Sequence, residues 1–255
     1  MIYDLQKASI LKRISAGLLD FILTLIIATG AFFLFSSIFN YDALTVELND
    51  HYDRYVETYG FDFRELTQEK VDKFTEEEKI NYEIAAKAFS EDKAIVTTIG
   101  KILSMTLLML TLGILIAILI VEFFVPLFFK NGQTLGKKMF GICLIMDNGV
   151  RVKTLPLFIR TVLGKFTVET MIFLYAFVLL YFGQLNIVML FLAAAIAIAN
   201  VILIIVSPKN LLIHDAMSFI VVVDKNTQMI FNTEDELIKY KKELAEKNAR
   251  SKKTF

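Results

Sequence analysis

The chain has 255 residues, 56% of them hydrophobic, and its 27 basic residues balance its 27 acidic ones. This apolar share exceeds that of an ordinary soluble domain and indicates an integral membrane protein. The single cysteine, Cys143, excludes an intrachain disulfide bond.

The first predicted membrane span covers residues 14–39, directly after the basic pair Lys12 and Arg13. A helix needs about 20 apolar residues to cross a bilayer, and this one also carries a carboxylate, Asp20. Arg13 and Asp20 are two helical turns apart, so they share a face and lie about 10 Å apart along the axis. A charge inside a span costs about 2.5–3.5 kcal/mol to insert, which makes Asp20 a candidate functional residue. Two interpretations remain open: a cation or proton site tuned by Arg13 or Arg160, or a structural ion pair.

Residues 40–96 form an acidic insertion, with 15 Asp and Glu against seven Lys and Arg, a net charge of −8. Apolar and tyrosine residues recur at helical spacing until Gly60, and Thr75 to Glu78 have the form of a capping box. We expect two or three helices here. The acidity would attract cations, but a solvated insertion is the simpler interpretation.

The second predicted span runs from about residue 95 to residue 129. It is longer than one bilayer thickness, so it must tilt, kink or protrude, and Pro126 is the candidate break. Glu122 near its end lies either inside the membrane or among the headgroups. It is a further candidate for an ion, proton or ion-pair site.

Residues 130–165 are basic, with seven Lys and Arg against the single acid Asp147. Asn148 and Gly149 separate two apolar stretches, which predicts a β-hairpin with a type I′ turn. Residues 154–164 surround Arg160 with apolar side chains, which is typical of a short helix lying in the membrane interface.

The glycine-rich stretch GQTLGKK, beginning at Gly132, lacks the spacing of a phosphate-binding P-loop. We therefore expect a turn at the membrane surface. There, Lys137 and Lys138 would contact anionic lipid headgroups.

Two further spans are predicted at residues 166–182 and 187–206, joined by a tight turn at 183–186. Ala193, Ala197 and Asn200 are a candidate packing face of the last span. Residues 219–224 are predicted to form a strand beside the hairpin, and the mixed-charge tail is predicted to form a solvated helix.

The distribution of charge predicts the topology. Basic segments near the membrane favour the cytoplasmic side, so the basic loop and both termini are expected there and the acidic insertion outside. The fold class is therefore an all-α integral membrane protein with four transmembrane helices, a small cytoplasmic β element and an extracytoplasmic helical insertion.

Arg13 and Asp20 in the first span, the GQTLGKK stretch with its hairpin, and His214-Asp215 before the last strand occur in this order. Together they resemble the RDD family of membrane proteins, named for one arginine and two aspartates, which map to Arg13, Asp20 and Asp215. The resemblance covers a transmembrane domain of residues 8–39 and 97–224. The insertion at 40–96 and the tail at 225–255 depart from it. It implies a bacterial inner membrane, the cell membrane, and transport, including cation/proton exchange in some members.

Two functions from different classes fit these observations. The first is a transporter, or transporter subunit, for small ions, with Arg13, Asp20, Glu122, Arg160 and Asp215 as its ion or ion-pair site. The second is a non-transporting partner or regulatory subunit of another membrane or envelope protein. Four spans are few for a lone transporter, so we expect a homo-oligomer or a partner membrane protein in the bilayer.

Enzymatic chemistry has little support in the sequence, because no nucleophile and base are arranged together. Only two histidines are present, His51 and His214, and no ligand spacing supports a zinc site. His214 beside Asp215 would suit a proton relay or a surface ion pair. We expect no metal, cofactor or nucleic acid, and a packed, apolar role for Cys143.

Overall fold

The computed structural model describes residues 4–181 and 186–253 and divides into two compact units. One unit comprises Met1–Ala28 with Ile114–Phe255, and the other comprises Thr29–Gly113. Among the described residues, four helical stretches are long and apolar enough to span a membrane: Ile10–Ile38, Lys93–Phe129, Thr154–Tyr181 and Ile187–Val206. With one small two-stranded sheet, this confirms the predicted all-α membrane fold and implies a bilayer environment.

The helix α1 (Ile10–Ile38) has an almost entirely apolar sequence and buries only Ala16 and Asp20. Its large side chains, such as Phe21 and Ile26, are exposed. An exposed apolar helix of this length is stable where lipid surrounds it, because all its backbone hydrogen bonds are made internally. The buried positions therefore mark the side of α1 that contacts protein.

The second span is continuous through Pro126, where the sequence suggested a break. Its segments are α5 (Lys93–Ile118), the π-helical η1 (Leu119–Phe124) and α6 (Val125–Phe129). Proline has no N–H for the carbonyl four residues before it, which belongs to Glu122. The hydroxyl of Thr161 donates to that carbonyl at 3.1 Å, so the buried group has a hydrogen-bond partner.

The third span differs from the prediction. The expected interfacial helix is the beginning of one continuous helix: α8 (Thr154–Phe158), the π-helical η2 (Ile159–Met171) and α9 (Ile172–Tyr181). Arg160 is buried, because its charge finds carboxylates inside the protein and does not have to reach water.

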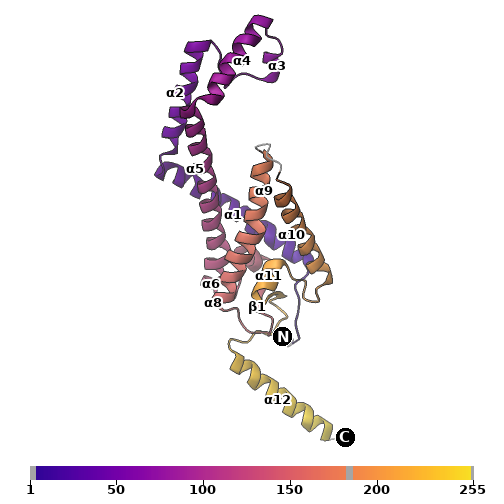
Figure 1. Ribbon diagram of the computed structural model, residues 1–255. Helices are drawn as coiled ribbons and strands as arrows, with labels where there is room; N and C mark the ends of the chain where they lie inside the picture. Colours follow the sequence, from indigo (N-terminus) through magenta and orange to yellow (C-terminus); the bar gives the residue numbers. More distant parts are fainter. Residues whose placement is uncertain (1–3, 182–185, 254–255) are drawn as a thin grey trace. The chain divides into compact units, whose positions relative to one another are not determined.

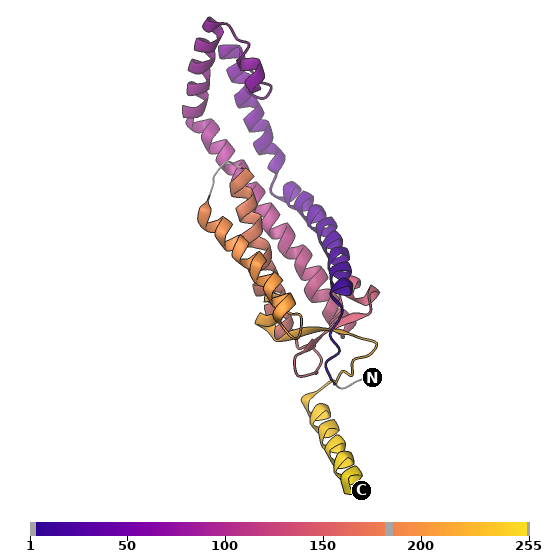
Figure 2. The same ribbon diagram turned by 90° about the vertical axis from the view of Figure 1, so that its right-hand side faces the viewer.

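The fourth span, α10 (Ile187–Val206), begins where the side chain of Asn186 accepts a hydrogen bond from the Met189 amide at 3.1 Å. It packs beside α9, as Figures 1 and 2 show. The predicted turn at 183–186 lies largely outside the described residues. Of its candidate packing face, Ala193 is buried and Asn200 binds Glu169 at 3.3 Å.

A small β element follows the short helix α7 (Leu135–Met139). The strands β1 (Ile142–Met146) and β2 (Ile220–Asp224) pair antiparallel, as the sequence suggested. Both faces are buried, with Leu144 and Val222 on one and Cys143 on the other. The short helix α11 (Ile213–Ser218) comes directly before β2 in the sequence.

The hairpin after β1 is shorter than predicted and its turn is of another type. The Gly149 amide donates to the Met146 carbonyl at 2.9 Å, and Gly149 has a φ of 91°. Asn148 has no positive φ, so the type I′ prediction is wrong. The turn has a single left-handed residue, Gly149. Beyond it, the predicted second strand of the hairpin is reduced to an isolated bridge between Ile145 and Arg151.

The acidic insertion forms α2 (Tyr41–Tyr59), α3 (Gln68–Val71) and α4 (Glu76–Glu91), with α2 beside α4 in Figure 1. The predicted capping box is confirmed: the Thr75 hydroxyl accepts from the Glu78 amide, and Glu78 accepts from the Thr75 amide at 2.8 Å. Seven rings stack or meet edge to face between these segments: Tyr52, Tyr55, Phe61, Phe63, Phe74, Tyr82 and Phe89.

The charged tail is the helix α12 (Glu234–Lys253). Near its start, Leu237 packs with Phe231 and Val150.

Candidate functional site

Asp20 is buried on α1 and is bound by the glycine-rich stretch. Its Oδ1 accepts from the Gly136 amide at 2.8 Å, and its Oδ2 accepts from the Thr134 hydroxyl. The Lys137 ammonium lies 3.4 Å from Oδ2. The partner of Asp20 is therefore Lys137, rather than the Arg13 or Arg160 suggested by the sequence.

Glu122 lies on the π-helical segment η1 and has three cations around one carboxylate. Its Oε2 is 3.2 Å from the Lys137 ammonium and 3.1 Å from Nη1 of Arg160. Its Oε1 accepts from the ammonium of Lys165. Only 1% of the Glu122 side chain is exposed, so the three cations replace the water that would otherwise solvate it.

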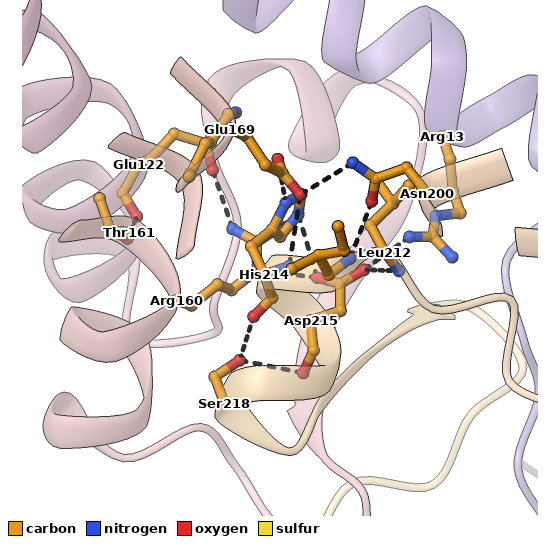
Figure 3. A network of polar contacts seen from close by, with 12 residues as sticks. Arg13, Glu122, Arg160, Thr161, Glu169, Asn200, Leu212, His214, Asp215 and Ser218 are labelled. Carbon is orange, nitrogen blue, oxygen red and sulfur yellow. Dashed lines mark hydrogen bonds and ion pairs between the residues drawn. The ribbon is translucent and has the colours of Figure 1, made fainter. Parts of the chain in front are cut away.

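Asp215 on α11 joins the first and third spans. Its Oδ1 accepts from Nε of Arg160 at 2.9 Å, and its Oδ2 accepts from Nη2 of Arg13 at 2.7 Å. Arg13 also donates to the carbonyl of Asn210. This carboxylate fixes the helix α11 between two arginines from separate spans (Figure 3).

His214 connects this group to a further carboxylate. Its Nδ1 lies 2.7 Å from Oε2 of Glu169, and its Nε2 lies 3.0 Å from Nη2 of Arg160. Asn200 on α10 donates to Glu169 at 3.3 Å and accepts from the Ile213 amide at 2.8 Å. In Figure 3, the ring of His214 lies between Glu169 and Arg160 and contacts both.

Two glycines make these contacts sterically feasible. A Cβ on Gly136 would lie 2.8 Å from Oδ1 of Asp20, and one on Gly164 would lie 2.6 Å from Cβ of His214. Atoms of real side chains do not approach this closely. The α7 segment and the η2 segment therefore both need glycine where they touch the network.

The network is one connected group of balanced charges. Its four carboxylates are Asp20, Glu122, Glu169 and Asp215, and its four basic side chains are Arg13, Lys137, Arg160 and Lys165. Hydrogen bonds through His214 and Thr134 complete it. Seven of the eight charges have an opposite neighbour, and the eighth, Glu169, is hydrogen-bonded by His214 and Asn200, so the buried set remains compatible with an apolar environment.

The surroundings shift two pKa values on the segments outside the spans. Burial lowers the pKa of the Lys137 ammonium, and the nearby Arg160 acts in the same direction. Burial alone would raise the pKa of Asp215, but contacts with His214, Arg160 and Arg13 outweigh it and hold that pKa well below its usual range.

All five candidate ion-site residues from the sequence lie in this network: Arg13, Asp20, Glu122, Arg160 and Asp215. The two lysines assigned to lipid headgroups lie in different environments. Lys137 is buried in the network, which corrects that expectation, whereas Lys138 is exposed, with its ammonium 4.2 Å from the centroid of the Phe129 ring.

Sequence reasoning missed Lys165 and Glu169 as site residues. Both belong to an apolar helix, and ionisable residues in such helices are costly, so the signal was present. For Lys165 it was obscured because the third span was expected to begin only after that residue, whereas Glu169 lay inside the predicted span and was overlooked. Within the described residues, no group of three or more His, Cys, Asp or Glu side chains is arranged to hold a metal ion.

A cavity of about 320 Å³ adjoins the network. Its charged lining comes from Arg13, Glu122, Lys137, Arg160 and Lys165. Apolar residues of α1, α10, both strands and the segment before α11 form most of the remaining wall, and His214 on α11 completes it.

The described residues contain four apolar helical spans, a buried charge network that links them, and a small two-stranded sheet. Together these define a multi-pass helical membrane protein. The model of the RDD family matches residues 7–218, most of the chain, and the protein belongs to this family. No curated protein and no solved structure matches the chain.

Proposed function

We propose that this protein exchanges protons for small cations across the membrane, as an oligomer or as a subunit of a larger transporter. The observation that carries the proposal is the buried network of four carboxylates and four bases beside a cavity. Ionisable groups inside a membrane are costly, and they commonly mark ion pathways and proton relays.

Lys137 is the central group in this proposal, because its ammonium lies between Asp20 at 3.4 Å and Glu122 at 3.2 Å. Protonation of one carboxylate would remove its attraction for the ammonium and favour a shift toward the other. A lowered lysine pKa also brings proton release closer to neutral pH. The lysine can thus couple the charge states of the two carboxylates.

The π-helical segments add support. Glu122 lies on η1, while Arg160, Lys165 and Glu169 lie on η2. Wider helical turns of this kind are rare and occur frequently at functional sites. In both spans, the irregular turn coincides with the ionisable residues.

We place the protein in the cell membrane with both termini in the cytoplasm, because the loop at 130–165 is basic and the insertion is acidic. The family implies a bacterial source. Four spans leave little room for a complete pathway in one chain, so the proposal includes assembly with a second copy or a partner.

The test is ion flux in liposomes that contain only the purified protein. Na⁺, K⁺ and H⁺ gradients are imposed in turn on the wild type, on Glu122→Gln and on the exposed control Glu83→Gln. We expect cation-driven proton movement in the wild type and the control, and its loss in Glu122→Gln. Flux indistinguishable from empty liposomes in the wild type would overturn the proposal.

A second candidate function is a non-transporting partner protein, favoured by one observation: each carboxylate of the network already has a cation or histidine beside it. In this candidate function, the network serves solely to hold the helices together. Asp20→Asn would then strand Lys137 and destabilise the protein by about 3–5 kcal/mol. Adding Lys137→Gln would restore stability, and neither variant would change ion flux.

A further inference from the structure

The wall of the cavity is strongly cationic, although the whole network is balanced. Four of its lining side chains are basic and only one, Glu122, is acidic. The carboxylates that balance the others, Asp20, Asp215 and Glu169, are hydrogen-bonded elsewhere in the network and do not line the cavity. Its volume of about 320 Å³ falls within the range of small-molecule sites, about 300–1,000 Å³.

Lys165 is the cation most able to accept a further partner. Its side chain is 30% exposed, against 8% for Lys137, 7% for Arg13 and 4% for Arg160. Among the described residues, its ammonium contacts only Glu122. An ammonium has three N–H donors, so two remain for a ligand.

Apart from His214, the rest of the cavity wall is apolar and comes partly from membrane spans. Ile14 and Gly17 lie on α1, and Ile204 lies on α10. Ile142 and Val222 of the sheet also contribute. Cations beside an apolar wall fit an amphipathic anion better than a fully hydrated one.

We propose that this cavity binds a phosphate-bearing anion. The several oxygens of a phosphate can contact more than one of the basic side chains at once, and arginine and lysine are the usual phosphate ligands in proteins. Lys165 and Arg13 hold the phosphate, and the apolar wall favours a phospholipid as its source over free phosphate. This site rests on Lys165 and Arg13, whereas the proposed ion exchange rests on Asp20, Glu122 and Lys137, so binding can be measured separately from transport.

The experiment measures equilibrium binding to the full chain in dodecyl maltoside micelles. Phosphatidylglycerol and inorganic phosphate are titrated separately, with native mass spectrometry for the lipid and the shift in thermal unfolding temperature for both. Binding of the lipid alone assigns a phospholipid headgroup. Stabilisation by phosphate, with displacement of the lipid, assigns a free anion. If neither probe binds the wild type, the proposal is overturned.

Two variants act on the site in different ways, so that one remains informative if the other fails to fold. Lys165→Gln removes the positive charge and the ammonium group, and its control is Lys138→Gln, which lies on the surface outside the cavity. We expect at least tenfold weaker binding in Lys165→Gln and wild-type binding in the control. An equal loss of binding in both variants, or wild-type binding in both, contradicts a built site.

Gly17 lines the cavity, and a Cβ added there meets nothing within 4 Å. Gly17→Leu therefore has room for a larger side chain, which occupies the cavity and leaves every charge unchanged. Gly30→Leu is the matched control: it lies on the same helix, with equally open space and no place in the cavity wall. We expect loss of binding in the first and wild-type binding in the second. Wild-type affinity in Gly17→Leu would overturn the proposal.

Discussion

At the scale of single residues, the distance between η2 and α11 depends on Gly164. Nothing larger than hydrogen fits, because an added Cβ would lie 2.6 Å from Cβ and 2.7 Å from Cα of His214. The second of these atoms belongs to the backbone and cannot rotate away. Gly164 thereby sets how close His214 comes to Glu169 and Arg160.

Gly164→Ala should therefore destabilise the protein by about 1–3 kcal/mol, the usual cost of overpacking. The control is Gly100→Ala, also helical, where an added Cβ meets nothing within 4 Å. There the change should be neutral or stabilising by up to about 1 kcal/mol. Unfolding in micelles followed by circular dichroism compares them, and equal stability of the two variants would refute the close approach.

Cys143 should be chemically silent in the folded protein. It is fully buried in β1, and burial raises the pKa of its thiol to about 12. The raised pKa keeps the thiol protonated through neutral and mildly alkaline pH, and only the thiolate reacts. We expect no maleimide labelling in micelles between pH 7 and pH 9, and full labelling in sodium dodecyl sulfate. Labelling that rises with pH in the folded protein would contradict this.

The residues of the site could be predicted better than their pairing. Asp20 and Glu122 stand out because a carboxylate in an apolar run is costly. The partner of Asp20 could not be predicted, since Lys137 reaches it only after the glycine-rich stretch folds against α1. Spacing along α1 suggested Arg13, which instead binds Asp215, 202 residues away in the sequence.

At the scale of elements, the positions of the spans follow from hydropathy, because length and apolarity alone determine whether a helix can cross a bilayer. The third span was predicted too short for a specific reason. Arg160 and Lys165 suggested an interface, but Glu122 and Asp215 neutralise them within the protein. Neutralisation between distant segments is a tertiary effect that local composition does not contain.

The contact between the second and third spans should depend on the hydroxyl of Thr161. It satisfies the Glu122 carbonyl, which Pro126 leaves without a helical donor. Thr161→Val keeps the shape and removes the donor, so it should cost about 1–3 kcal/mol for a buried unsatisfied carbonyl. Thr167→Val is the control, because its hydroxyl bonds to the Val162 carbonyl on an exposed face. Equal thermal stability of the two variants would show that the carbonyl has another partner.

At the scale of the whole molecule, the charge distribution predicts that the insertion and the basic loop face opposite sides of the membrane. Single cysteines at Asp62 and Asn148, with Cys143 silent, test this with an impermeant maleimide on intact cells. We expect labelling from outside at 62 only, and labelling at both positions after permeabilisation. Labelling of both in intact cells would refute the topology.

The central claim, that the buried network exchanges protons for cations, is tested most directly by proton flux through the Asp20→Asn variant in liposomes. The substitution keeps the size of the side chain but removes its charge and titration, and it replaces one of two accepting oxygens with an amide nitrogen that donates. Asp147→Asn is the matched control, because that carboxylate is exposed and pairs only with Lys209, at 3.5 Å, among the described residues. A cation gradient should drive protons through the wild type and the control. It should drive none through Asp20→Asn, measured on protein whose abundance and thermal stability equal those of the wild type. Wild-type proton flux through Asp20→Asn would contradict the claim.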